Sequence, residues 1–164
     1  MSGASLDLIK DAVNGVSCPV LANGNISSAQ KAIKVQEYTG CYGTMVGRSA
    51  IRNPWIFRQI RELQAGETPF APTLSDVREY IEKLYLATGK ADMSPRRHVG
   101  MLKKFLNFIA QSVDEEGNFM HDIRRAKDPD DMRAICDRHL LGEHADTPYS
   151  DEPYQGLIAR PNSE

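Results

Sequence analysis

The feature that most constrains the fold is a change of pattern near residue 66. Before it, two short apolar runs, CPVLA and YGTMV, alternate with helical segments in the order helix, strand, helix, strand, helix. Strands that alternate with helices pair in parallel, because each helix returns the chain to the same end of the sheet. After it, every periodic stretch has the helical period. The sequence therefore predicts an α/β part at 1–66, a proline-containing linker at 67–72, a helical bundle at 73–142 and a loosely ordered, turn-rich tail at 143–164.

Capping signals predict where the helices begin and end. Ser27 followed by Gln30 matches a capping box, and Gly40 stands where a helix ends in a left-handed residue. Asn53 is expected to cap a helix that has Pro54 at its first position. In the second part, helices are expected to open at Thr73 with Asp76, at Ser94–Pro95 and at Asp128–Pro129, with apolar faces formed by Val77, Tyr80, Ile81, Leu84, Val99, Leu102, Leu106, Ile109, Met132 and Ile135.

Composition excludes several classes of protein. The 164 residues are 41% hydrophobic and 26% charged with a formal net charge of −2, so a nucleic acid would have to bind a local patch. No apolar run approaches the roughly 20 residues of a membrane span, and no segment has the basic stretch followed by an apolar core that a signal peptide would show. The three cysteines, Cys18, Cys41 and Cys136, lack pair spacing, which favours a reducing cytoplasm and three small buried apolar side chains. The histidines show no ligand spacing, so no metal site is expected.

Glycine-containing loops follow both predicted strands. Asn23, Gly24 and Asn25 follow the first strand, and Gly47 and Arg48 follow the second. Glycine lets backbone N–H groups approach an anion, and an arginine adds a bidentate charged contact. Either loop alone is typical of an ordinary turn with a solvated charge. Because parallel strands end at the same edge of a sheet, the two loops together predict a phosphate site.

The segment PVLANGNISSAQKAI followed by TGCYGTMVGRSAIRNPWIFRQI resembles the end of the barrel in the tRNA-dihydrouridine synthase family, from about Leu6 to Ile60. That family has a Pro-Val strand leading into Asn-Gly-Asp, then Met-Ile-Gly-Arg and Asn-Pro-Trp-Ile-Phe. The resemblance implies the last strands and helices of a TIM (β/α)8 barrel, followed by a helical tRNA-binding domain. It implies that Asn23, Gly24, Asn25, Gly47 and Arg48 bind the phosphate of FMN, although Asn25 replaces the usual acid and Ser49 a usual glycine.

The same resemblance implies a reaction. It is the FMN-dependent reduction of a tRNA uridine to 5,6-dihydrouridine, in which NADPH reduces the flavin and a cysteine on an earlier barrel loop supplies the proton. A closed barrel takes roughly 250 residues, whereas this chain has room for two strands, and none of its cysteines takes the acid's place. We therefore expect a C-terminal fragment of this oxidoreductase, inactive alone, without a catalytic residue of its own, and prone to self-association through the open barrel edge.

A basic cluster on the second bundle helix is the candidate RNA-binding surface. Phosphate contacts from such a cluster would position RNA without reading its sequence. An ordinary solvated helix face is an equal alternative, His98 is equally compatible with a core histidine, and Trp55 is expected to pack. The cluster comprises Arg96, Arg97, His98, Lys103 and Lys104.

Two alternative functions remain open for the whole chain. One is a non-catalytic RNA-binding module with a barrel remnant, and the other is another FMN-binding or phosphate-binding TIM-barrel enzyme.

Overall fold

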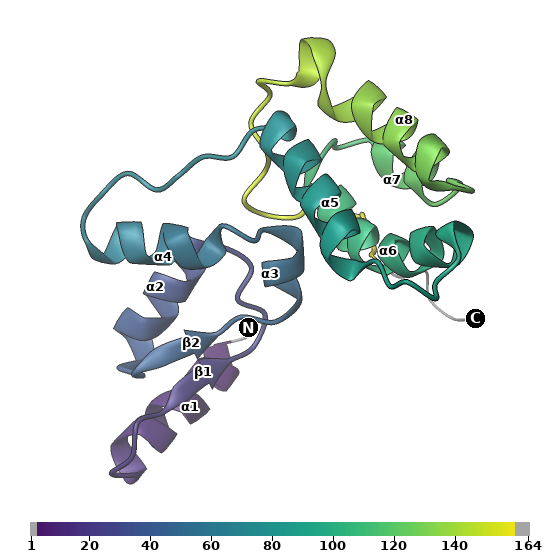
Figure 1. Ribbon diagram of the computed structural model, residues 1–164. Coiled ribbons are helices and arrows are strands. Elements are labelled where there is room, and N and C mark those ends of the chain that lie inside the picture. Colours follow the sequence, from purple (N-terminus) through teal and green to yellow (C-terminus); the bar gives the residue numbers. More distant parts are fainter. Residues whose placement is uncertain (1–2, 160–164) are drawn as a thin grey trace. The chain divides into compact units, whose positions relative to one another are not determined.

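The computed structural model describes residues 3–159, and the chain divides into two compact units, Met1–Phe70 and Ala71–Glu164 (Figure 1). An α/β part followed by an all-helical part is confirmed. Within residues 3–159, no helix combines the length and the hydropathy that crossing a bilayer needs. The elements are α1 (Gly3–Gly15), β1 (Leu21–Asn23), α2 (Ala29–Thr39), β2 (Gly43–Met45), α3 (Arg48–Arg52), α4 (Ile56–Gln64), α5 (Leu74–Thr88), α6 (Pro95–Ile109), the 3-10 turn Ala110–Ser112, α7 (Asn118–Ile123), α8 (Pro129–Leu140) and the 3-10 turn Gly142–His144.

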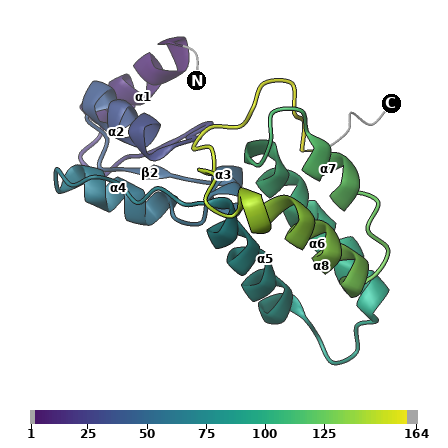
Figure 2. The ribbon, with the colours of Figure 1, turned by 90° about the horizontal axis from the view of Figure 1, so that it is seen from above.

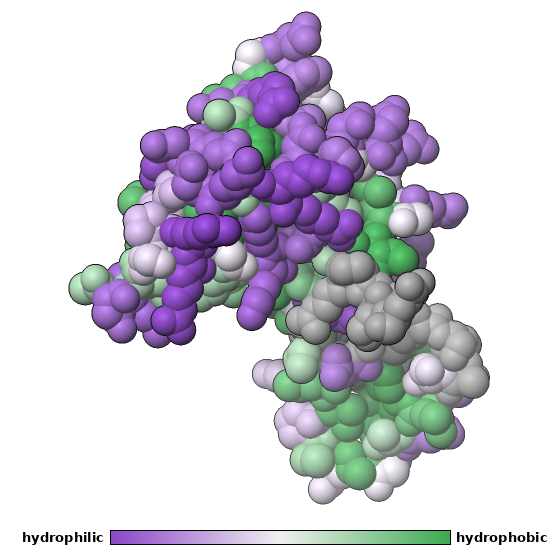
Figure 3. Space-filling view, turned by 90° about the vertical axis from the view of Figure 1, so that its right-hand side faces the viewer, coloured by the Kyte–Doolittle hydropathy of each residue, from purple (hydrophilic) through white to green (hydrophobic). Residues whose placement is uncertain are grey.

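The first unit is built on a short parallel sheet. Leu21 lies opposite Gly43 and Asn23 opposite Met45, so each strand pairs over three residues, fewer than the apolar runs suggested. Ala22 points toward the helices and is fully buried. Because successive strand residues face opposite sides, Leu21 and Met45 lie on the other face, where they are 61% and 50% exposed. Apolar side chains open to solvent are visible at the lower end of Figure 3, where α1 and the strands lie in Figure 1.

Most capping predictions are confirmed. Asp128 caps α8 by accepting the N–H of Asp131 at 2.9 Å, and Ser94 caps α6. Thr73 and Asp76 form the capping box of α5. Gly40 ends α2 at a φ of 70°, a left-handed conformation in which a side chain is disfavoured.

Two predicted helix starts were wrong. α2 is capped by Ser28, which accepts the N–H of Lys31, whereas the Ser27 hydroxyl accepts from the Lys31 ammonium. The helix after Asn53 begins two residues later than expected, at Ile56. Asn53 instead accepts the N–H of Trp55 at 3.1 Å, which places the intervening proline in a turn. In both places, the side chain predicted to cap the helix forms a different local hydrogen bond, and the helix starts at a later residue.

The sequence did not predict the two short helices α3 and α7. α3 has five residues and α7 has six, so neither shows a helical period in the sequence. α7 starts after Gly117, whose φ is 74°, and the Asp114 carboxylate accepts the N–H groups of Asn118 and Phe119. The segment around residue 116 is therefore a helix start capped by a carboxylate.

The expectation of a loose tail was wrong for residues 145–159. Tyr149 is 4% exposed, its hydroxyl donates to the Ile109 carbonyl at 2.8 Å, and its N–H donates to the Pro72 carbonyl. The Ile158 carbonyl accepts from Arg124 at 2.7 Å. A buried aromatic side chain anchors this segment on the bundle despite its turn-rich composition. The remainder of the tail, 160–164, lies outside the described residues.

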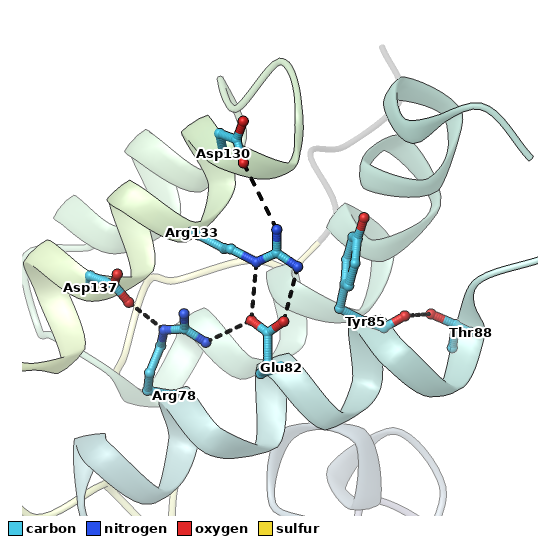
Figure 4. A network of polar contacts seen from close by, with 7 residues as sticks. All are labelled: Arg78, Glu82, Tyr85, Thr88, Asp130, Arg133 and Asp137. Carbon is cyan, nitrogen blue, oxygen red and sulfur yellow. Dashed lines mark hydrogen bonds and ion pairs between the residues drawn. The ribbon is translucent and has the colours of Figure 1, made fainter.

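The bundle has a continuous apolar core under a charged contact between α5 and α8. Figure 2 shows α8 running along α5 and α6, and the α6 core positions predicted from the sequence are all buried. Glu82 of α5 accepts from Arg133 of α8 at 3.0 Å and from Arg78 at 3.1 Å (Figure 4). Arg78 also binds Asp137, and the Arg133 guanidinium lies 4.7 Å from the centre of the Tyr85 ring. These contacts clamp α8 onto α5.

This clamp predicts a loss of stability in acid. Hydrogen bonds from Arg133 and Arg78 hold the pKa of Glu82 below its ordinary value, although burial opposes them. The stabilisation that ionised Glu82 provides is therefore complete above the pKa that this carboxyl has in the unfolded chain, about 4.3. It is lost as the pH falls through the lower pKa of Glu82 in the folded protein. Glu82→Gln is expected to cost about 1 kcal/mol or less at pH 7 and to flatten this acid dependence. Urea unfolding from pH 3 to 7 measures it. The control is Glu79→Gln, whose exposed side chain pairs with Lys83 on α5 alone; identical pH profiles for both variants would contradict the clamp.

Candidate functional site

The two loops predicted to bind phosphate leave the sheet at the same edge. The last strand pair is Asn23 with Met45. Gly24 and Asn25 follow directly after β1, and Gly47 follows two residues after the end of β2. Because the strands are parallel, both loops start within one strand spacing of each other, about 4.8 Å. The structure therefore brings the predicted loops together.

The first loop has a backbone that restricts its residue types. Gly24 has a φ of 141° and Asn25 a φ of 40°. Positive φ is disfavoured for most side chains, and asparagine tolerates it better than others. The Asn23 and Asn25 side chains are exposed. The loop thus turns sharply at two consecutive residues and presents two amides at the sheet edge.

The second loop opens α3 without a capping side chain. Gly47 is the N-cap of α3, and among the described residues no side chain accepts from the first N–H groups of this helix. The N–H of Ala50 donates to the Gly47 carbonyl at 3.0 Å, whereas the N–H groups that precede it in a helix have no acceptor within the helix. A Cβ added at Gly47 would meet no atom within 4 Å, so packing does not require glycine here. Arg48, expected in a loop, is the exposed first residue of α3.

A buried arginine that the sequence analysis missed joins the two loops. Arg52 is 3% exposed, and its guanidinium donates to the carbonyl of Ser27, which is also buried. α3 is thereby attached to the segment that connects the first loop to α2. A charged residue in the short segment AIRNP gives no sign of burial in the sequence, because burial here depends on a partner 25 residues away.

A second buried polar contact fixes the turn between α3 and α4. The Asn53 side chain, 1% exposed, donates to Gln59 at 2.8 Å, and Gln59 donates to the Phe70 carbonyl at 2.7 Å. Trp55 packs on Phe70 with ring centres 6.0 Å apart, which confirms its predicted packing role. These contacts stabilise the helices behind the loops.

The cysteines divide between core and surface. Cys41 and Cys136 are buried, as expected, but Cys18 is exposed and its predicted burial was wrong. Cys18 precedes the three-residue ladder of β1, so no neighbouring strand covers it. Burial raises the pKa of Cys136 to about 12, which keeps this thiol protonated near neutral pH. No group of three metal-binding side chains occurs within residues 3–159.

The basic cluster on α6 is exposed except at two positions. Arg96, Arg97 and Lys104 are exposed, and Lys103 is half-buried with its ammonium 3.0 Å from the Arg124 carbonyl. His98 is 5% exposed. Its ring stacks on Tyr85 at 4.4 Å, and its Nε2 lies 2.9 Å from the Thr88 hydroxyl. His98 is therefore a hydrogen-bonded core residue with little surface to offer a phosphate.

Comparison with known proteins identifies the family. Residues 2–144 match the family model described as dihydrouridine synthase (Dus). The chain belongs to the Dus family. It is 34% identical over 122 residues to tRNA-dihydrouridine synthase B of Xanthomonas axonopodis pv. citri, a match that covers 71% of this chain and 35% of that protein. The resemblance seen in the sequence motifs is confirmed.

Other Dus relatives show the same pattern of coverage. tRNA-dihydrouridine synthase B of Pseudomonas putida is 40% identical over 104 residues, covering 59% of this chain and 31% of the relative. A tRNA-dihydrouridine(16) synthase of Neisseria meningitidis is 26% identical over 132 residues, a match that covers 80% of this chain and 40% of that protein. The chain thus spans between 31% and 40% of the length of these three relatives.

The buried arginine predicts a difference between two α3 variants. Arg52→Met removes the contact with Ser27 and is expected to destabilise the first unit by about 1–3 kcal/mol, because the buried carbonyl loses its charged donor. Arg48→Met, at an exposed position on the same helix, is the control and is expected to change stability by about 0.5 kcal/mol or less. Amide hydrogen exchange of residues 21–35 measures both. Equal exchange rates in the two variants would rule out Arg52 as the connection between the loops.

Proposed function

We propose that this chain contributes the end of the FMN-binding barrel and the tRNA-binding domain of a tRNA-dihydrouridine synthase. The whole enzyme would reduce a tRNA uridine to 5,6-dihydrouridine with FMN and NADPH, in the cytoplasm. The observation that carries the proposal is the pair of glycine-containing loops at one edge of a parallel sheet, in a chain of the Dus family. In parallel α/β sheets, ligands bind beyond this edge.

The open face of the sheet supports the barrel part of the proposal. Leu21 and Met45 are more exposed than a folded sheet normally leaves large apolar residues, whereas Ala22 on the opposite face is buried under helices. In a (β/α)8 barrel, helices cover the outside and large apolar side chains fill the interior. We therefore propose that the exposed face of β1 and β2 is a barrel interior face.

The loops fit a phosphate group. We propose that backbone N–H groups of Gly24 and Gly47 approach the FMN phosphate, that Arg48 adds a charged contact, and that Asn23 and Asn25 contact the same ligand. The open space at the Gly47 Cβ position fits close approach of a ligand to the backbone. FMN reduced by NADPH would supply the hydride for the C5=C6 bond of uridine, a separate acid would supply the proton, and the residues of these loops would bind and orient the flavin.

The described residues offer no convincing proton donor, so we assign no catalytic residue to this chain. Cys41 and Cys136 are buried, and the raised pKa of Cys136 makes it a poor acid. Cys18 is exposed but precedes β1, at the end of the strand opposite the loops. We propose that the acid belongs to another part of the barrel.

The helical bundle is the proposed tRNA-binding part. Arg96, Arg97, Lys103 and Lys104 lie on α6, and none of them forms an ion pair within the described residues. Unpaired cations on one helix are suited to phosphate contacts that position RNA. We leave His98 out of this surface because it is buried.

Substituting the α6 cations tests the RNA part. Replacing Arg96, Arg97, Lys103 and Lys104 together with Ala is expected to weaken tRNA binding. Each lost phosphate contact should reduce the slope of log affinity against log salt by about 0.7–0.9. Fluorescence anisotropy with labelled tRNA at several salt concentrations measures both quantities. Unchanged affinity and slope would assign the cluster to an ordinary solvated helix face.

Flavin content and turnover test the barrel part. We expect the purified 164-residue chain to be colourless, to self-associate through its open sheet, and to form no dihydrouridine from tRNA with NADPH and added FMN. Two strands provide little apolar contact for a flavin ring, and loss of a general acid alone costs about 10²- to 10⁴-fold in rate. Absorbance at 450 nm, light scattering and product analysis measure these properties. A yellow monomer, or turnover above the no-enzyme control, would contradict the proposal, whereas tRNA binding without flavin binding is its expected result.

A further inference from the structure

One face of α6 leads directly to the end of α7. Arg96, Gly100, Lys103 and Asn107 are spaced by four, three and four residues, so they lie on one side of the helix. The Lys103 ammonium donates to the Arg124 carbonyl at 3.0 Å, and Arg124 Nε donates to Asn107 at 2.6 Å. The C-terminal end of α7 is therefore placed beside this side of α6.

The cations along this path are oriented without being neutralised. Arg124 is held by Asn107 and by the Ile158 carbonyl, and Arg125 by the His121 carbonyl at 2.9 Å. All these acceptors are uncharged, and within the described residues neither arginine forms an ion pair. A guanidinium has five N–H donors, so each keeps donors for an external anion.

Other arginines of the bundle are neutralised by carboxylates. Arg78 and Arg133 pair with Glu82, and Arg138 pairs with Asp122. In the groove beside α7, the lining includes Arg124 and Arg125 but a single carboxylate, that of Glu116. Positive charge is therefore concentrated where α6 and α7 meet, while the α5–α8 contact is internally compensated.

Gly100 leaves a gap in the middle of this path. It is exposed in the interior of α6, where glycine costs about 1 kcal/mol relative to alanine. A Cβ at this position would meet no atom within 4 Å, so neighbouring helices do not require the glycine. The helix backbone is consequently open between Arg96 and Lys103, which permits an external chain to approach closely.

We propose that the phosphate backbone of RNA lies along this surface, the α6–α7 ridge, formed by Arg96, Gly100, Lys103, Arg124 and Arg125. The inference rests on the proposed tRNA-binding function and extends it beyond α6. Arg124 and Arg125 contribute phosphate contacts from the turn that follows α7. Gly100 acts through the absence of a side chain, which lets the sugar–phosphate chain approach α6 between two cations.

Single substitutions in the full chain test the ridge. Arg125→Gln is expected to weaken tRNA binding about two- to fivefold and to reduce the salt slope by about 0.7–0.9. Gly100→Gln is expected to weaken binding about fivefold with an unchanged slope, because it fills the gap without removing charge. Gly100→Ala should raise the unfolding temperature and keep binding within about twofold of the unsubstituted chain. Lys83→Gln, which removes an exposed cation of α5 that pairs with Glu79, is the matched control and should leave tRNA binding unchanged.

The outcomes separate the ridge from the broader proposal. If the fourfold α6 variant loses tRNA binding while Arg125→Gln and Gly100→Gln bind as tightly as the unsubstituted chain, the ridge is wrong and RNA binding by α6 stands. If the fourfold α6 variant also binds normally, the proposed RNA-binding function fails and the ridge with it. Thermal unfolding of each variant shows that it is folded, and weakened binding by a folded Arg125→Gln or Gly100→Gln variant supports the ridge.

Discussion

The first unit depends on the parallel pairing of two three-residue strands. The register that sets Asn23 opposite Met45 makes both glycine-containing loops leave from one edge, and it turns Ala22 toward α2. A slip by one residue would exchange the buried and open faces of a strand, which would bury the larger Leu21 where Ala22 now fits. The register therefore specifies the packing of the helices and the meeting of the two loops at the same time.

Buried hydrogen bonds keep the loops in place behind this sheet. Arg52 attaches α3 to the Ser27 carbonyl, and Asn53 and Gln59 connect the start of α4 to the Phe70 carbonyl. A buried polar group is costly when its partner is lost, so such contacts favour one arrangement of the loops over others. The exposed residues suited to a phosphate, Arg48 among them, are thus carried by a scaffold of buried polar contacts.

The second unit uses its charges in two different ways. Between α5 and α8, Glu82 and Asp137 accept from Arg78 and Arg133, so those arginines stabilise the bundle. Along α6 and the end of α7, arginines and lysines meet only neutral carbonyls and amides within the described residues. Paired charges attract external anions weakly, whereas oriented and uncompensated ones attract them strongly. This contrast separates a structural surface from the proposed RNA-binding surface.

The sequence by itself determined the two-part organisation, the starts of α5, α6 and α8, and the family, since periodicity, capping residues such as Asp128 and the glycine motifs are local properties. It also placed Asn23–Asn25 and Gly47–Arg48 at strand ends. Only the tertiary structure decided that Arg52 and His98 are buried, that Cys18 is exposed, and that Tyr149 anchors the tail. Each of these depends on partners distant in the chain or on the extent of a strand ladder, and no local pattern encodes such a partner. The cations of α6 are close together in the sequence, so the sequence alone predicted that cluster. Arg124 and Arg125 are distant from it in the sequence, and only the packing of α7 beside α6 shows that they extend the same basic surface.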